Sequence, residues 1–149
     1  MFAQLRALFS SSDDRAGQER QLQLAAAAVL AEAAALDGHV DQVECDRIVQ
    51  MLAQHFHLGP FEAEALLREA RALAEQSVQL AGFARTLKDG LDQPDRVRLI
   101  EMLWEVAYAD GHLHEYEANL VRRIAGLIHV PDQDAGAARK RVMARLGMD

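Results

Sequence analysis

Apolar residues along this chain recur at a spacing that is helical from one end to the other. They return every three or four positions in successive stretches, which is the period of an amphipathic helix. No segment shows the sustained alternation of a half-buried strand. Short breaks containing Gly, Pro or Asp separate the stretches, and Pro60, Pro94 and Pro131 each stand where a helix can begin. The pattern predicts an all-α fold.

The expected architecture is a compact bundle of about seven helices plus a short N-terminal helix. Short connections between the helices imply mostly antiparallel neighbours. The cluster of Ser and Asp at residues 10–14 is expected to break the first helix, since these residues favour caps and turns. Residues 1–17 are therefore interpreted as an amphipathic helix and linker, and residues 18–149 as the helical domain. The expected helices cover roughly residues 2–9, 18–36, 41–56, 60–74, 77–90, 92–109, 115–128 and 131–146.

One hairpin pattern occurs twice in the chain. When Asp37 is aligned with Asp110, residues 28–50 and 101–123 match without a gap and are identical at seven positions. Both copies read Glu, four residues, Asp-Gly-His, four residues, Glu. Neither hairpin buries its apolar stripe alone, so the two copies are expected to pack about a pseudo-twofold axis.

Composition and charge narrow the class of protein. The net charge of −7 argues against general nucleic-acid binding, which requires a basic footprint. With Cys45 as the single cysteine, neither an intramolecular disulfide nor a cysteine-based zinc site can form. The N-terminus does not read as a secretory signal, and the longest apolar run, residues 24–31, is far too short to span a membrane. A cytoplasmic protein is expected.

The repeated carboxylates are the candidate chemistry. Glu105 lies in a helix that is apolar nearly all round, and Glu32 repeats the situation among alanines. A buried carboxylate is costly unless it is paired or binds a metal ion. If the two halves pair, the acidic residues approach one region and would repel each other without a cation. Carboxylates favour Ca²⁺, Mg²⁺ or Mn²⁺, and His39 and His112 would widen the choice towards Zn²⁺. The candidate ligands are Glu32, Asp37, Glu44, Glu105, Asp110 and Glu117.

An interpretation without a metal remains open. Gly38 and Gly111 suit helix ends, and Glu44 and Glu117 suit the first turn of a helix. Asp37 and Asp110 would then only bond backbone N–H groups in their turns. In that case the protein is an interaction module, whose partner meets the amphipathic residues 2–9 or the basic last helix. A weaker alternative is a small-molecule pocket beside Trp104 and Tyr108, which are more often core residues.

Several known site types are excluded by spacing. The segment that starts at Asp37 has Gly at its second position, whereas an EF-hand loop requires Gly at the sixth. The sequence contains no His-Glu-x-x-His, no phosphate-binding loop, no dinucleotide fingerprint and no nucleophile motif. An enzyme is therefore not indicated.

The two hairpins, Glu32…Asp37-Gly38…Glu44 and Glu105…Asp110-Gly111…Glu117, resemble the TerB family, an all-α domain associated with tellurite resistance. The resemblance covers about residues 20–146, and the Leu- and Phe-rich start at residues 2–9 is also similar. It implies a compact helical domain in the bacterial cytoplasm, a stress-response setting and a metal-ion site formed by these acidic residues. Similar domains occur fused to others, including J-domain co-chaperones, which implies a scaffold role. The halves differ at Asp41 and Gln42 against His114 and Glu115, so they need not bind equally.

Overall fold

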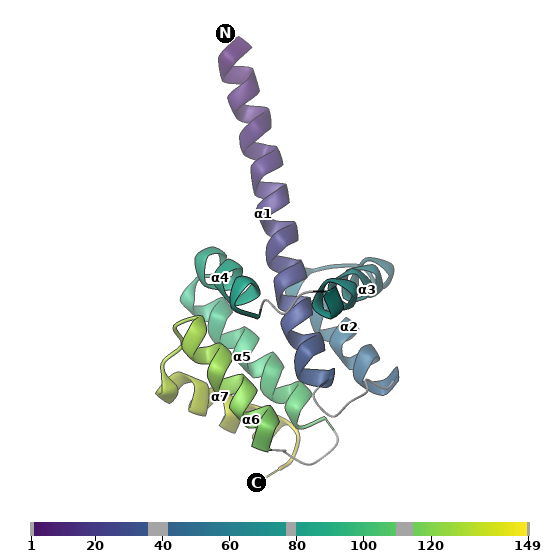
Figure 1. Cartoon of the computed structure of the whole chain (residues 1–149), viewed down its shortest axis with the longest axis vertical. Helices are drawn as coiled ribbons and strands as arrows, with labels where there is room; N and C mark the ends of the chain where they lie inside the picture. Colours follow the sequence, from purple (N-terminus) through teal and green to yellow (C-terminus); the bar gives the residue numbers. More distant parts are fainter. Residues whose placement is uncertain (1, 36–41, 77–79, 110–114, 149) are drawn as a thin grey trace.

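The computed structural model describes residues 2–35, 42–76, 80–109 and 115–148 (Figure 1). These ranges form seven helices and contain no strand, which confirms the all-α fold. In chain order the helices are α1 (Phe2–Ala34), α2 (Gln42–Phe56), α3 (Pro60–Gln76), α4 (Leu80–Gly90), α5 (Gln93–Ala107), α6 (Glu115–Leu127) and α7 (Asp132–Arg145).

The first helix differs from the expectation. α1 runs without interruption from Phe2 to Ala34, so the predicted break at residues 10–14 is absent and no separate short helix precedes the bundle. Ser and Asp are only moderate helix formers, but neither removes a backbone donor or clashes with the preceding turn as Pro does. The first half of α1 extends well beyond the body of the molecule, and its second half enters the bundle (Figure 1).

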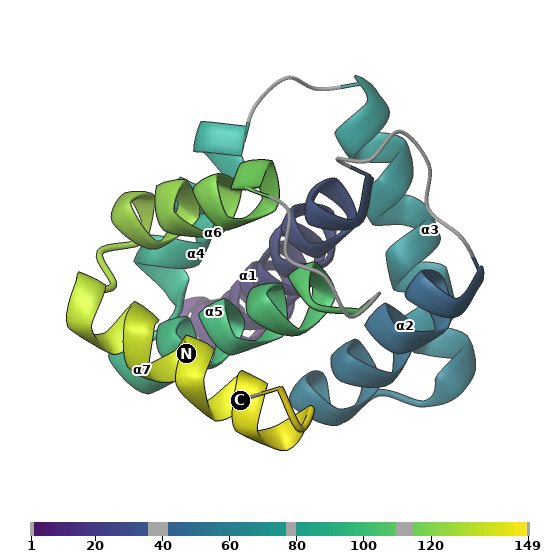
Figure 2. The ribbon, with the colours of Figure 1, turned by 90° about the horizontal axis from the view of Figure 1, so that it is seen from below.

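The second half of α1 is the centre of the core. It packs against α3, α4 and α5, and the other helices surround it when the molecule is seen from below (Figure 2). Most of its residues between Ala25 and Ala34 are buried, and most of these are alanine. Alanine has a short side chain, so the neighbouring helices approach α1 closely. Large side chains such as Leu52, Leu66 and Leu103 fill the space between the outer helices.

The two hairpins pack on each other as the repeat predicts. The first is α1 with α2, and the second is α5 with α6. α1 contacts α5 directly, α1 also contacts α6, and α5 also contacts α2. The first helix of each hairpin thus contacts both helices of the other hairpin. α3 and α4 cover α1, and α7 covers α5.

Three helices end in a left-handed residue. His57, His129 and Gly147 have φ values of 56°, 60° and 71°, and they follow α2, α6 and α7. In each case the next residue donates its N–H to the carbonyl five residues earlier, at N···O distances of 2.8–3.0 Å. This is the Schellman motif, in which glycine is the usual left-handed residue.

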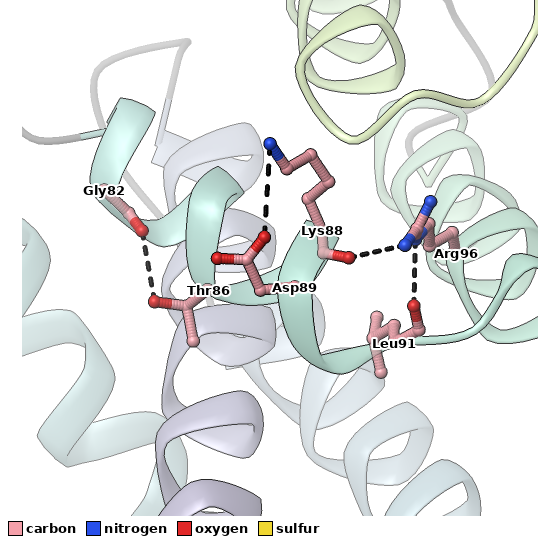
Figure 3. Close-up of polar contacts among 6 residues, drawn as sticks. All are labelled: Gly82, Thr86, Lys88, Asp89, Leu91 and Arg96. Atoms are coloured by element: carbon pink, nitrogen blue, oxygen red, sulfur yellow. Dashed lines mark hydrogen bonds and ion pairs between the residues drawn. The ribbon is translucent and has the colours of Figure 1, made fainter.

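The link between α4 and α5 is held by side chains (Figure 3). Arg96, in α5, donates to the carbonyl of Leu91 at 2.9 Å and to that of Lys88 at 2.5 Å, so it satisfies the C-terminal end of α4. Asp92 caps α5 by accepting a hydrogen bond from the N–H of Asp95 at 3.0 Å. Among the helices that the structure describes, none combines the length and the apolar character needed to cross a membrane.

Candidate functional site

The repeated acidic residues are distributed over four helices. Glu32 lies in α1, Glu44 in the first turn of α2, Glu105 in α5 and Glu117 in the first turn of α6. The first-turn positions of Glu44 and Glu117 agree with the prediction, and each of the two residues takes part in an interaction. The other candidates, Asp37, His39, Asp110 and His112, lie outside the described residues.

Glu32 is half-buried in a small pocket. The pocket has a volume of about 170 Å³, and Ala31, Ala35, Arg71 and Ala74 line it together with Glu32. Burial raises the pKa of the Glu32 carboxyl above its usual 4.5, and the charge of Arg123 acts in the opposite direction. Arg123 lies in α6, so a cation of the second hairpin faces the glutamate of the first.

Glu105 is also half-buried, but it lines a different pocket of about 260 Å³. This pocket lies where α5 meets α2 and the end of α7, and its walls include Met51, His55 and Arg145. Glu32 and Glu105 therefore do not share a pocket. Within the described ranges, no three His, Cys, Asp or Glu side chains come together in a way that holds a metal ion.

The Glu105 pocket has a row of charged side chains along α5. Arg98, Glu101 and Glu105 recur at helical spacing and so lie on one face. Glu101 is paired twice from α7, with Arg145 at 3.1 Å and with Arg141 at 3.5 Å. Sequence reasoning missed the pocket residues Arg98, Glu101 and His55. The row of charges on an otherwise apolar helix was the signal for Arg98 and Glu101, whereas nothing in the pattern of α2 marked His55.

The pKa of His55, which lines this pocket, is shifted by its surroundings. Burial lowers the pKa of its imidazole below 6.5, and the charge of Arg98 acts in the same direction. Asp95 opposes the shift, and His57 adds to it. At neutral pH the side chain is therefore uncharged, and it can both donate and accept a hydrogen bond.

The basic last helix is largely engaged within the domain. Besides the two arginines on Glu101, Arg139 donates from Nε to the hydroxyl of Tyr108 at 2.7 Å. Its guanidinium lies 5.2 Å from the centroid of the Trp104 ring. Trp104 in turn donates from Nε1 to the carbonyl of Ala135 at 3.2 Å.

These contacts join α5 to α7 and cover the two aromatic rings. Trp104 and Tyr108 are only 2% and 4% exposed. They are core residues that dock the last helix, which is the more common role of such rings.

The fold defines a class of protein: a small all-α domain built on a duplicated hairpin, with half-buried glutamates on its two inner helices. Comparison with known families gives the particular family. The family model described as tellurite resistance protein TerB matches residues 23–140, and the chain belongs to this family. The match begins where α1 enters the core, so the projecting half of α1 lies outside it. Neither the curated proteins nor the solved structures gave a match.

Proposed function

We propose that this protein is a non-enzymatic, tellurite-response domain of bacterial cytoplasm that binds a divalent cation through the carboxylates of its two hairpins. The family match supports the association with tellurite resistance. The duplicated pattern of acidic residues supports the cation, because six carboxylates in two equivalent hairpins suit a hard divalent ion. The metal would hold the two hairpins together by neutralising their acidic residues.

The observation that carries the proposal is the common end of the bundle at which both hairpins turn. The C-terminal ends of α1 and α5 and the N-terminal starts of α2 and α6 all lie at the end of the body opposite the projecting half of α1 (Figures 1 and 2). Asp37 and Asp110 follow the ends of α1 and α5 in sequence, and Glu44 and Glu117 stand in the first turns of α2 and α6. Glu44 and Glu117 thus bring one oxygen donor of each hairpin to the same end of the molecule.

The donor set fits Ca²⁺, Mg²⁺ or Mn²⁺, and imidazole from His39 or His112 would favour Zn²⁺ or Mn²⁺. Glu32 and Glu105 line separate pockets, so they are poorly placed to bind the same ion. The carboxylates closest in sequence to the two hairpin turns are the better candidates for its ligands. We therefore assign the main role to Asp37, Asp110, Glu44 and Glu117, with Glu32 and Glu105 as outer contributors.

Calorimetry on the metal-free full chain tests the proposal. We expect binding heat and a higher melting temperature with at least one of Ca²⁺, Mg²⁺, Mn²⁺ and Zn²⁺, since a ligand that binds only the folded state stabilises it. Asp110→Asn should abolish both effects. Asp132→Asn, in the first turn of α7 away from the hairpin turns, is the matched control and should leave them intact. The absence of heat and of any melting shift with all four ions rejects the cation.

A second candidate function rests on the projecting half of α1. That segment extends beyond the body of the molecule (Figure 1) and contains the amphipathic residues 2–9. Most arginines of α7 are engaged internally, so residues 2–9 are the better candidate for contact with a partner protein. A pull-down with the full chain and with a variant lacking residues 1–12 tests this function. A partner that is lost only on truncation, with and without a chelator, supports it.

A further inference from the structure

The pocket between α2, α5 and the end of α7 shares only Glu105 with the cation proposal, and its other lining residues play no part in that proposal. Its volume is about 260 Å³, slightly below the range of about 300–1,000 Å³ that is typical of ligand pockets. Met51 and Met102 line its apolar part and are themselves buried. The remaining lining is polar or charged and includes Gln54 and His55. A pocket of this kind suits a small ligand with both apolar and polar parts.

Two opposite charges in the pocket have no ionic partner among the residues that the structure describes. Glu101 is neutralised by the arginines of α7, so Arg145 is already in use. Arg98 and Glu105 form no ion pair with any residue in the described part of the chain. They are seven residues apart on α5, so they lie on the same face, about 10 Å apart along the helix axis. The pocket thus presents a cationic group, Arg98, and an anionic group, Glu105, at opposite ends of one face of α5.

We propose that this pocket binds a short apolar peptide with free termini, of the size of a dipeptide. Arg98 receives the carboxylate, for which a guanidinium is the best-matched partner. Glu105 receives the ammonium group, and Met51 and Met102 contact the apolar side chain. Gln54 and the neutral His55 supply hydrogen bonds to the peptide group.

Charge and length both select this ligand. A simple cation would be repelled by Arg98 and a simple anion by Glu105, so neither is complementary to the pocket. Two extended residues span up to about 7 Å, and a charge-assisted hydrogen bond of about 2.8 Å at each end extends this reach beyond the roughly 10 Å between the two positions along the helix axis. A free amino acid is too short to reach both.

The site shares Glu105 with the proposed cation site, but the two proposals can be tested separately. Arg98 is not among the candidate metal ligands, and a change there should not affect cation binding. The peptide experiment is performed in the presence of a chelator, so its failure does not bear on the cation, and failure of the cation proposal does not bear on the pocket.

The test is calorimetric titration of the full chain with L-alanyl-L-leucine, and with its N-acetylated and C-amidated forms. We expect binding of the free dipeptide and at least about tenfold weaker binding of each blocked form, because each loses one charge-assisted contact. Arg98→Gln and Glu105→Gln should weaken the free dipeptide to the same extent. Arg98→Gln should also bind the amidated and free forms equally, because the variant no longer reads the carboxylate.

The controls are Arg85→Gln in α4 and Glu19→Gln in α1, both exposed and outside the pocket, and both should bind as the wild type does. Melting temperatures verify that all four variants are folded. The proposal is overturned if the free dipeptide gives no heat at millimolar concentration. It is equally overturned if the blocked forms bind as tightly, or if Arg98→Gln binds like the wild type.

Discussion

At the scale of single residues, the two left-handed histidines are the least expected feature of the backbone. His57 and His129 each occupy a position after a helix at which glycine is usual. A side chain with a Cβ is strained in this conformation, whereas glycine adopts it freely. The helices α2 and α6 therefore end at some cost in stability.

Replacing His129 by Gly should remove this strain. We expect His129→Gly to raise the free energy of unfolding by about 0.5–1 kcal/mol, measured by urea denaturation. Gly147→Ala is the converse control, because φ is already 71° there, and it should lower stability by a similar amount. A loss of stability in His129→Gly would show that the imidazole makes contacts worth more than the strain.

The lowered pKa of His55 makes stability depend on pH. Below about pH 6.5 the unfolded chain takes up a proton that the folded chain accepts only at lower pH, so stability falls as pH falls through this window. His55→Gln should remove this decline. The raised pKa of Glu32 acts in the opposite direction nearer its usual 4.5, because there the folded state binds the additional proton.

The measurement is the difference in unfolding free energy between wild type and His55→Gln at pH 7.5 and at about pH 5.5. Relative to wild type, the variant should gain stability on acidification, while Glu32→Gln, measured in parallel, should not. Parallel pH profiles for wild type and His55→Gln would contradict the effect of burial on this imidazole.

At the scale of helices, the link from α4 to α5 depends on one arginine. Arg96 is partly buried and donates to two carbonyls at the end of α4 (Figure 3). Arg96→Met keeps most of the apolar stem and removes both hydrogen bonds, so we expect a loss of about 2 kcal/mol in stability by urea denaturation. Arg85→Met, at an exposed position in α4, is the control and should change stability by less than about 0.5 kcal/mol. An equal effect of the two substitutions would contradict the capping role.

Most helices could be predicted from sequence because their boundaries carry strong local signals. Pro60, Pro94 and Pro131 mark starts that the structure confirms to within a few residues. The repeat also predicts the packing of the two hairpins. The continuity of α1 could not be predicted in this way, because residues 10–14 contain favoured cap residues that are nevertheless compatible with a helix.

The residues that line the pockets could not be predicted from the spacing of apolar residues. His55 and Arg98 meet because α2 crosses α5, and Glu32 faces Arg71 because α1 packs on α3. Such meetings depend on crossing angles and side-chain directions between distant parts of the chain, which a pattern on one helix does not contain. Glu32 and Glu105 were predicted to contribute to one shared site, but in the structure they line two different pockets.

At the scale of the whole molecule, α1 has two parts with different roles. Its second half is the central helix of the core, and Arg20 pairs with Glu69 of α3 near the point of entry. The family match begins at residue 23, beyond the projecting half. Folding of the bundle should therefore not depend on the first 15 residues.

Deleting residues 1–15 tests this division. We expect a folded domain whose melting temperature changes by less than about 2 °C, and whose circular dichroism loses only the helical signal of the deleted residues. A large fall in melting temperature, or loss of cooperative unfolding, would show that the projecting half stabilises the bundle.

The alanines of α1 have a consequence for how this protein can vary. Their small side chains set the distance between the central helix and its neighbours, so a larger residue at Ala27 or Ala28 has no space to enter. Substitutions of these alanines should be the least tolerated in the chain, even though alanine carries no chemistry. Selection at these positions acts on shape alone, and in a screen of all single variants the intolerant positions would trace the path of α1 through the bundle.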